Sequence, residues 1–243
     1  MHINNEIGNV LDLEAVGTLC KKYGAYFHSD AVQGVGHFHL DFSALPIDFL
    51  SASAHKFHGP KGIGFLYVSK ALRLQSMIKG GGQERGLRAG TEAVHNIVGM
   101  ATALELAYQN YDSEYQHILE IKKYFLDQIH AVFPEAICNG LSGDLARSTY
   151  TLVNISLPID QEKATILDFH LDLNGIACSK GSACQSGSSQ GSHVINALQR
   201  KDQYSDWPTL RFSFSCFNSK SEIDHLTTVL RQFATQEKPL ANS

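Results

Sequence analysis

The sequence contains no apolar run near the roughly 20 residues that a membrane-spanning helix needs. Its apolar stretches, such as Ile63–Val68, have the length of a strand. Residues 1–10 hold Asn4, Asn5 and Glu6 where a signal peptide would be apolar, so we expect no signal peptide. Lysine and arginine form no long cluster and the net charge is -4, which disfavours nucleic acid as a direct partner. We therefore expect a cytoplasmic protein without membrane contact.

Cysteine pairs with the spacing of a metal site are also missing. The five cysteines include no C-x2-C pair, and their odd number favours free thiols over a disulfide framework. A zinc site made of Cys178, Cys184 and His193 is an alternative. Otherwise we expect no metal site of the chain's own.

What remains is the composition of a globular protein, with 43% hydrophobic and 18% charged residues in a chain of 243. This length is typical of one or two domains. Residues 1–112 predict part of a larger α/β domain with a mainly parallel sheet, and residues 113–243 predict a smaller α/β domain. In the larger domain we expect a helix at Leu13–Tyr23 and strands at Ala25–His28, Phe49–Ala52 and Ile63–Val68.

Long helices are expected from about residue 93 to 108 and from 114 to 132. In the smaller domain, strands alternate with helices. The expected strands are Thr149–Leu157, Gly175–Ser179 and Thr209–Phe214, and the expected helices are Glu162–Leu173, His193–Gln199 and Ser219–Thr235. Between the second strand and the next helix, Ser179–His193 is rich in glycine and serine, which predicts a mobile loop around Cys184.

The densest chemical signal lies at Ser51–Gly64, SASAHKFHGPKGIG. A strand ends near Ser53 and enters a glycine-rich turn, which places Lys56 at the end of a strand. Partial desolvation there would lower the pKa of a lysine and make its amine available for covalent chemistry. A surface lysine beside a loop is the alternative interpretation of Lys56 alone.

A second polar group ends the preceding strand, where Ala25–Gln33 reads AYFHSDAVQ. An acid such as Asp30 at the carboxyl end of a buried strand needs a cationic partner. The pyridinium nitrogen of pyridoxal 5'-phosphate (PLP) is such a partner. Asp30 alone could instead cap a helix. Ligands bind at the carboxyl ends of strands in open α/β sheets, so Asp30, Gln33 and Lys56 together favour a cofactor site.

Six motifs in this order resemble the cysteine desulfurases of the class V aminotransferase superfamily, specifically the subgroup whose catalytic cysteine lies in a long Ser/Gly-rich loop. The motifs are NNEIG (4–8), HSDAVQ (28–33), SAHK (53–56), GGGQERGLRAGT (80–91), SKGSACQS (179–186) and LRFSFS (210–215). The resemblance runs from Asn4 to Phe233. It implies the PLP-dependent transferase fold type I and a homodimer.

The resemblance also implies roles for individual residues. Lys56 would bind PLP covalently, and Asp30 would pair with the ring nitrogen. Gln33 and Asn5 would lie on the side of the phenolic oxygen, with Asn5 also near the substrate carboxylate. The remaining implied contacts are the cofactor phosphate for Ser53 and His55, the phosphate of the partner subunit's cofactor for Thr91, and the substrate carboxylate for Arg211.

Cys184 would be the second catalytic residue besides Lys56. Its thiolate would take sulfur from L-cysteine, forming an enzyme persulfide and releasing alanine. The persulfide would pass to a sulfur-acceptor protein such as an iron–sulfur scaffold, or serve tRNA sulfur supply, and Cys184 could ligate a transferred iron–sulfur cluster. An unreactive exposed thiol is the alternative for Cys184.

The motif NNEIG lies midway along the cofactor domain in this family, so we expect the chain to be N-terminally truncated relative to it. The preceding segment normally supplies further strands and phosphate contacts. Two other functions therefore stay open. One is a selenocysteine lyase-like class V enzyme, and the other is an inactive remnant that acts only through partner binding.

Overall fold

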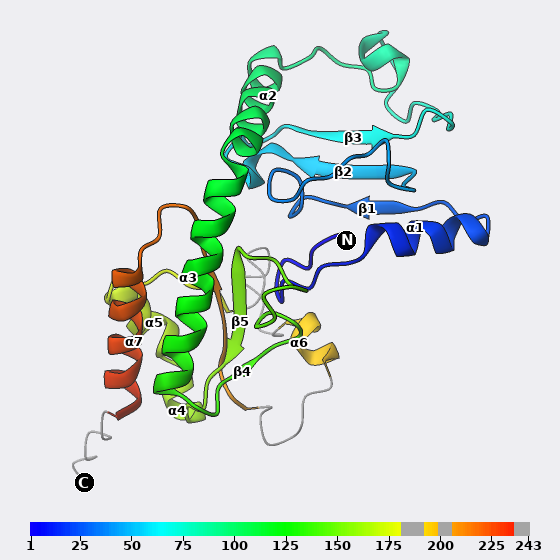
Figure 1. Ribbon diagram of the computed structural model, residues 1–243. Coiled ribbons are helices and arrows are strands. Elements are labelled where there is room, and N and C mark those ends of the chain that lie inside the picture. The colour runs from blue at the N-terminus through cyan, green and yellow to red at the C-terminus, as the bar shows by residue number, and fades with distance from the viewer. Residues whose placement is uncertain (181–191, 199–205, 236–243) are drawn as a thin grey trace. The chain divides into compact units, whose positions relative to one another are not determined.

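The computed structural model describes residues 1–180, 192–198 and 206–235, and it divides the chain into two compact units (Figure 1). The first unit comprises Met1–Ile3 and Leu11–Asp112, and the second comprises Asn4–Val10 and Ser113–Ser243. The expected domains, 1–112 and 113–243, differ from these units in residues 4–10. Their backbone bonds to the second unit, where the Thr149 amide donates to the Gly8 carbonyl over 2.8 Å.

The first unit contains a three-stranded sheet in the order β1-β2-β3. Its elements are α1 (Leu13–Lys22), β1 (His28–Asp30), β2 (Phe49–Ser53), the 3-10 turn η1 (Ala54–Lys56), β3 (Gly64–Val68), the 3-10 turn η2 (Gln83–Gly86) and α2 (Val94–Gln109). β1 and β2 are parallel, whereas β2 and β3 are antiparallel. The expectation of a mainly parallel sheet is thus wrong for β3. A parallel connection needs a crossover of a dozen or more residues, and only residues 54–63 join these two strands.

The first strand also starts later than expected. Ala25 and Tyr26 are exposed, and the Phe27 amide donates to the Asp48 carboxylate over 2.7 Å in place of a ladder bond. Regular pairing therefore begins at His28. Phe27 itself is buried in an apolar cluster with Leu50 and Phe57, against which Met100 of α2 packs. This cluster supports the strand ends that carry the candidate site.

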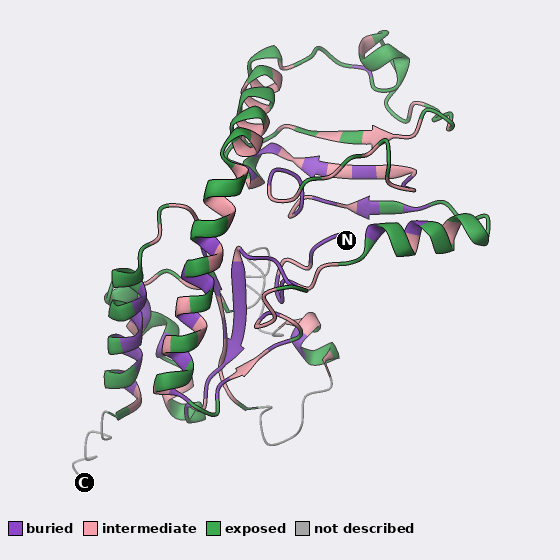
Figure 2. Cartoon of the chain, in the orientation of Figure 1, coloured by how far each residue is buried: buried purple, intermediate pink, exposed green. Residues whose placement is uncertain are grey.

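The second unit is built on an antiparallel sheet in the order β4-β5-β6. Its elements are α3 (Tyr111–Val132), which begins two residues before the unit, β4 (Ile137–Cys138), β5 (Leu152–Ser156), α4 (Gln161–Ala164), α5 (Leu167–Leu173), α6 (His193–Ala197), β6 (Thr209–Ser213) and α7 (Lys220–Thr235). All of β5 is buried (Figure 2). Helix α3 packs on β6, with the rings of Phe125 and Phe212 at 5.0 Å between centroids.

Two expected elements of the second unit take another form. The helix predicted at Glu162–Leu173 is two helices, because the Ile166 amide bonds to the Lys163 carbonyl three residues back. The strand predicted at Gly175–Ser179 is reduced to one bridge between Ser179 and Arg211. The Ile176 amide instead donates to the Leu171 carbonyl and closes the end of α5.

One lysine lies inside this unit. Lys122 of α3 is 0% exposed, and its ammonium nitrogen donates to the Ser148 hydroxyl and the Thr149 carbonyl, each over 2.7 Å. Both acceptors belong to the loop before β5, which also bonds to residues 4–10. Lys122 therefore fixes this loop to α3. Across the described residues, no helix combines the length and apolar character that crossing a membrane requires.

Replacing Lys122 by Met should remove a pH-dependent part of the stability. Burial lowers the pKa of Lys122 from 10.5 to about 8. Between these values the unfolded chain binds a proton that the folded chain has released, so the free energy of unfolding should rise with pH, by roughly 3 kcal/mol at most. Urea unfolding at about pH 8 and about pH 10 measures this rise in the unchanged chain and in Lys122→Met.

The exposed neighbour Lys123 provides the matched control, Lys123→Met. The control should keep the rise, because its ammonium group is exposed to water in the folded chain. An equal rise in the Lys122 and Lys123 variants would contradict the role given to burial.

Candidate cofactor and substrate site

Asp30 and Ser53 end the two parallel strands of the first unit. Asp30 pairs with Ser51, so both strands end at the same edge of the sheet. One oxygen of the Asp30 carboxylate accepts a bond from the Val32 amide over 2.9 Å. This bond closes a turn after β1, so the local role of Asp30 is in a turn and not at a helix start. The other oxygen, Oδ2, accepts no hydrogen bond from the described residues and suits a cationic partner.

The backbone that carries Lys56 is held firmly. The 3-10 turn Ala54–Lys56 follows β2, and Ala54 and Phe57 on either side are buried. The Lys56 carbonyl bonds to the His37 imidazole over 2.8 Å. The Gly59 amide donates to the Ala54 carbonyl over 2.9 Å. The half-buried side chain of Lys56 thus starts from a fixed position one turn beyond the strand.

Four polar side chains at or just beyond the ends of β1 and β2 make no hydrogen bond within the described chain. They are Gln33, Ser53, His55 and Lys56. An edge with an amide, a hydroxyl, an imidazole and an amine beside a carboxylate offers what PLP needs: partners for its phosphate, its phenolic oxygen and its ring nitrogen. The donor set therefore fits PLP. Thr91, expected at the phosphate of a partner's cofactor, is exposed in the loop before α2.

The second unit contains Asn5 and Arg211, the two residues expected at the substrate carboxylate. A guanidinium nitrogen of Arg211, Nη1, donates to the Asn5 carbonyl over 2.9 Å. A second, Nη2, donates to the Ser179 hydroxyl over 3.3 Å. These two bonds fix the plane of the guanidinium group, which is the property that two-pronged recognition of a carboxylate requires.

The NNEIG motif forms a turn stabilised by its own residues. The Asn4 side-chain oxygen accepts bonds from the Glu6 and Ile7 amides over 2.9 and 3.0 Å. Gly8 adopts a φ of +70°, and a Cβ there would come within 3.0 Å of Leu152. Glycine is therefore required for both its conformation and its small size.

Sequence reasoning missed Glu6 and Asn154. Asn154 lies in the middle of β5 with 0% exposure, and its side chain donates to the Glu6 carbonyl over 3.0 Å. The Glu6 side chain is 1% exposed and its carboxylate accepts a bond from the Ser192 hydroxyl. The sequence offered one signal for each residue. Asn154 is a polar residue in a mainly apolar strand, and Glu6 is an acid in the NNEIG motif.

Cys184 lies outside the described residues, as does the zinc alternative that depends on it. The residues that flank the segment containing Cys184 (180–191), Ser179 and Ser192, are described. On one side Ser179 forms a bridge with Arg211. On the other, Ser192 caps α6, accepting a bond from the Ile195 amide over 3.1 Å. Cys178, expected in a strand, lies before that bridge outside any strand and is partly buried.

Comparison with known proteins places the chain in a family. Residues 1–226 match the model of the aminotransferase class-V family. The chain therefore belongs to the aminotransferase class-V family, whose cofactor is PLP. It is 39% identical over 241 residues to the cysteine desulfurase IscS of Clostridium botulinum (strain Hall), a match that covers 99% of this chain and 60% of that protein. The chain thus spans about 60% of the length of this relative.

Solved structures show the same fold. A NifS-like protein from Rickettsia africae matches with a TM-score of 0.80 and 30% identity, over 96% of this chain and 60% of that one. SspA in complex with cysteine matches with a TM-score of 0.69 and 31% identity, over 90% of this chain and 58% of that one. The expected α/β architecture of PLP-dependent transferase fold type I is confirmed.

Cys178 should react slowly with alkylating reagents. Burial, with a further contribution from the Asp168 carboxylate, raises the pKa of Cys178 to about 11. At neutral pH its thiolate fraction is then far below that of an ordinary thiol, and we expect alkylation at least about 10-fold slower than in a short cysteine peptide. Iodoacetamide labelling followed by peptide mass spectrometry measures the rate. A rate equal to that of the peptide would show that Cys178 is accessible and reactive.

Proposed function

We propose that the protein to which this chain belongs is a cysteine desulfurase, which removes sulfur from L-cysteine to give L-alanine and an enzyme persulfide. The observation that carries the proposal is the sheet edge where Asp30 ends β1 and Lys56 follows the adjacent parallel strand β2, with polar side chains that have no described internal partner. The similarity to a cysteine desulfurase and to a structure that contains cysteine supports this choice of substrate.

The residues of the first unit would hold the cofactor. Asp30 would pair with its ring nitrogen and Lys56 would bind it covalently, with Ser53 and His55 at the phosphate and Gln33 at the phenolic oxygen. When bound, PLP withdraws electrons from an attached amino acid and so weakens the carbon–sulfur bond of cysteine. The residues of this unit would bind the cofactor and orient it. The Lys56 amine would move protons at the substrate carbon.

The second unit would supply the groups that act on the substrate. Arg211 and Asn5 would hold its carboxylate. The Cys184 thiolate would attack the substrate sulfur, so that a sulfur–sulfur bond forms as the carbon–sulfur bond breaks. The electron pair of the broken bond stays with the carbon fragment, which takes up a proton to become alanine. The balance needs no external oxidant.

The persulfide on Cys184 would then pass to a sulfur-acceptor protein such as an iron–sulfur scaffold. In this role Cys184 could also contact an iron–sulfur cluster as cargo. We propose a homodimer as the working form, in which the exposed Thr91 reaches the phosphate of the partner subunit's cofactor.

The experiment is to mix the purified chain with PLP, L-cysteine and a thiol reductant that releases the persulfide sulfur as sulfide, then record the visible spectrum, alanine release and sulfide. Lys56→Ala should abolish the protein-bound cofactor band and reduce alanine release by at least about 100-fold, because it removes both the covalent anchor and the proton-transfer group. Cys184→Ser should keep the band and lose sulfide production. Lys61→Ala changes an exposed lysine in the turn after η1 and should leave all three readouts unaltered.

Two outcomes would separate the alternatives. The cofactor band could be absent both from the chain alone and after addition of the part of the longer relative that lies outside the 60% matched by this chain. That result would favour a remnant that acts only through partner binding. Faster turnover of selenocysteine than of cysteine, with activity retained in Cys184→Ser, would favour a selenocysteine lyase-like enzyme.

A further inference from the structure

Two facing residues of the second unit hold consecutive peptide groups of the NNEIG motif. Asn154 on β5 and Arg211 on β6 are paired across the sheet. Asn154 donates to the Glu6 carbonyl over 3.0 Å, and Arg211 donates to the Asn5 carbonyl over 2.9 Å. The dipeptide Asn5–Glu6 is therefore fixed to the sheet at both of its carbonyls.

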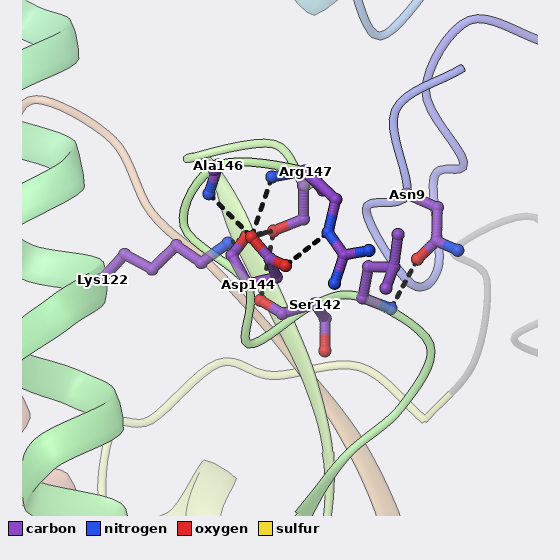
Figure 3. A network of polar contacts seen from close by, with 8 residues as sticks. Asn9, Lys122, Ser142, Asp144, Ala146 and Arg147 are labelled. Carbon is purple, nitrogen blue, oxygen red and sulfur yellow. Dashed lines mark hydrogen bonds and ion pairs between the residues drawn. The ribbon is translucent and has the colours of Figure 1, made fainter. Parts of the chain in front are cut away.

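Further polar contacts make this attachment rigid. The Asn154 side-chain oxygen accepts a bond from Asn139 over 2.8 Å, so the amide group of Asn154 cannot rotate freely. Directly after the motif, the Asn9 side chain accepts a bond from the Leu141 amide over 2.7 Å. Figure 3 shows this contact beside the loop in which Arg147 and Asp144 form an ion pair and toward which Lys122 extends.

The same dipeptide contacts both ends of the segment that contains Cys184. On the N-terminal side, Arg211 joins Asn5 to Ser179 through its guanidinium group and through two backbone bonds of 2.8 and 3.1 Å. On the C-terminal side, the Glu6 carboxylate accepts a bond from the Ser192 hydroxyl. The two described residues that flank this segment, Ser179 and Ser192, are thus anchored at the adjacent residues Asn5 and Glu6.

Burial of the Glu6 carboxylate is unfavourable in free energy. Glu6 is 1% exposed, and burying a carboxylate in a protein costs free energy unless its oxygens are bonded. Among the described residues its hydrogen bond comes from Ser192 alone, and Ser192 also caps α6. Glu6 is thus a buried acid whose described hydrogen bond holds the residue directly before the five-residue helix α6. This indicates that Glu6 fixes the position at which α6 begins.

We propose that Glu6 is a positioning residue, which holds the C-terminal end of the Cys184 segment at the substrate-binding dipeptide through Ser192. The inference rests on the proposed function for the identity of Cys184 as the sulfur carrier. Glu6 does not touch the reacting sulfur in this assignment. It acts by restricting where the segment ends, as the Arg211–Ser179 bridge does at the other end.

The test reverses the direction of the hydrogen bond between Ser192, the donor, and Glu6, the acceptor. In Ser192→Asp the new carboxylate still caps α6, since Asp is a good N-cap residue, but it faces Glu6 without a proton to donate. In Glu6→Gln the amide oxygen still accepts from the Ser192 hydroxyl. In the double variant the Gln amide donates to the Asp carboxylate, so the contact is restored with its direction reversed.

The first readout is the rate at which trypsin cleaves after Lys180, measured on the chain without cofactor. We expect about fivefold faster cleavage in Ser192→Asp, and rates near that of the unchanged chain in Glu6→Gln and in the double variant. The second readout is turnover of L-cysteine with PLP and a thiol reductant that removes the persulfide sulfur. Ser192→Asp should lower kcat by about tenfold with KM and the cofactor band unaltered, and the double variant should recover most of this loss.

Ser219→Asp is the matched control, because Ser219 also precedes a helix and its hydroxyl also bonds to a carboxylate, that of Glu222 over 3.3 Å. It should change neither readout. Cleavage that is unaltered in Ser192→Asp, or not restored in the double variant, would overturn the inference. If cleavage responds as expected but the unchanged chain with PLP forms no persulfide, the anchor stands and the proposed function fails.

Discussion

The candidate substrate site depends on two hydrogen bonds, from Asn154 to the Glu6 carbonyl and from Arg211 to the Asn5 carbonyl. A buried asparagine in the centre of an apolar strand needs hydrogen bonds for its amide group, and here its nitrogen donates to the Glu6 carbonyl and its oxygen accepts from Asn139. The need for hydrogen-bond partners is mutual between the sheet and residues 4–10. Residues 4–10 need the sheet to satisfy their peptide groups, and the sheet needs residues 4–10 to satisfy Asn154. This mutual need assigns the motif to the second unit.

The first unit shows the opposite arrangement. At the edge formed by β1 and β2, the backbone is fixed by buried Ala54 and Phe57, while the side chains of Ser53, His55 and Lys56 make no hydrogen bond with the described chain. A rigid backbone that presents polar side chains without internal partners is typical of a ligand-binding site. The chemistry of those side chains, with the Asp30 carboxylate beside them, selects an anionic, aromatic cofactor with a basic ring nitrogen.

Local patterns predicted most elements but not their partners. Apolar spacing located the helices α1, α3 and α7 and the strands β2 and β6 to within a few residues. It missed the direction of β3, which depends on the length of a connection, and it extended the strand before Cys184 through residues whose amides close α5. The roles assigned to Asp30, Lys56 and Arg211 came from ordered motifs. Glu6 and Asn154 escaped because each matters through a contact between residues more than a hundred positions apart, which no local pattern records.

These contacts also change how Asn5 and Arg211 are understood. From their motifs they are two separate candidates for the substrate carboxylate. In the structure they are bonded to each other, and Arg211 is bonded in turn to Ser179 at the start of the Cys184 segment. A guanidinium group already oriented by two neutral acceptors loses little conformational entropy when it binds a carboxylate. Any change that displaces the Asn5 carbonyl would therefore disturb the proposed substrate contact of Arg211 and its anchor at Ser179 together.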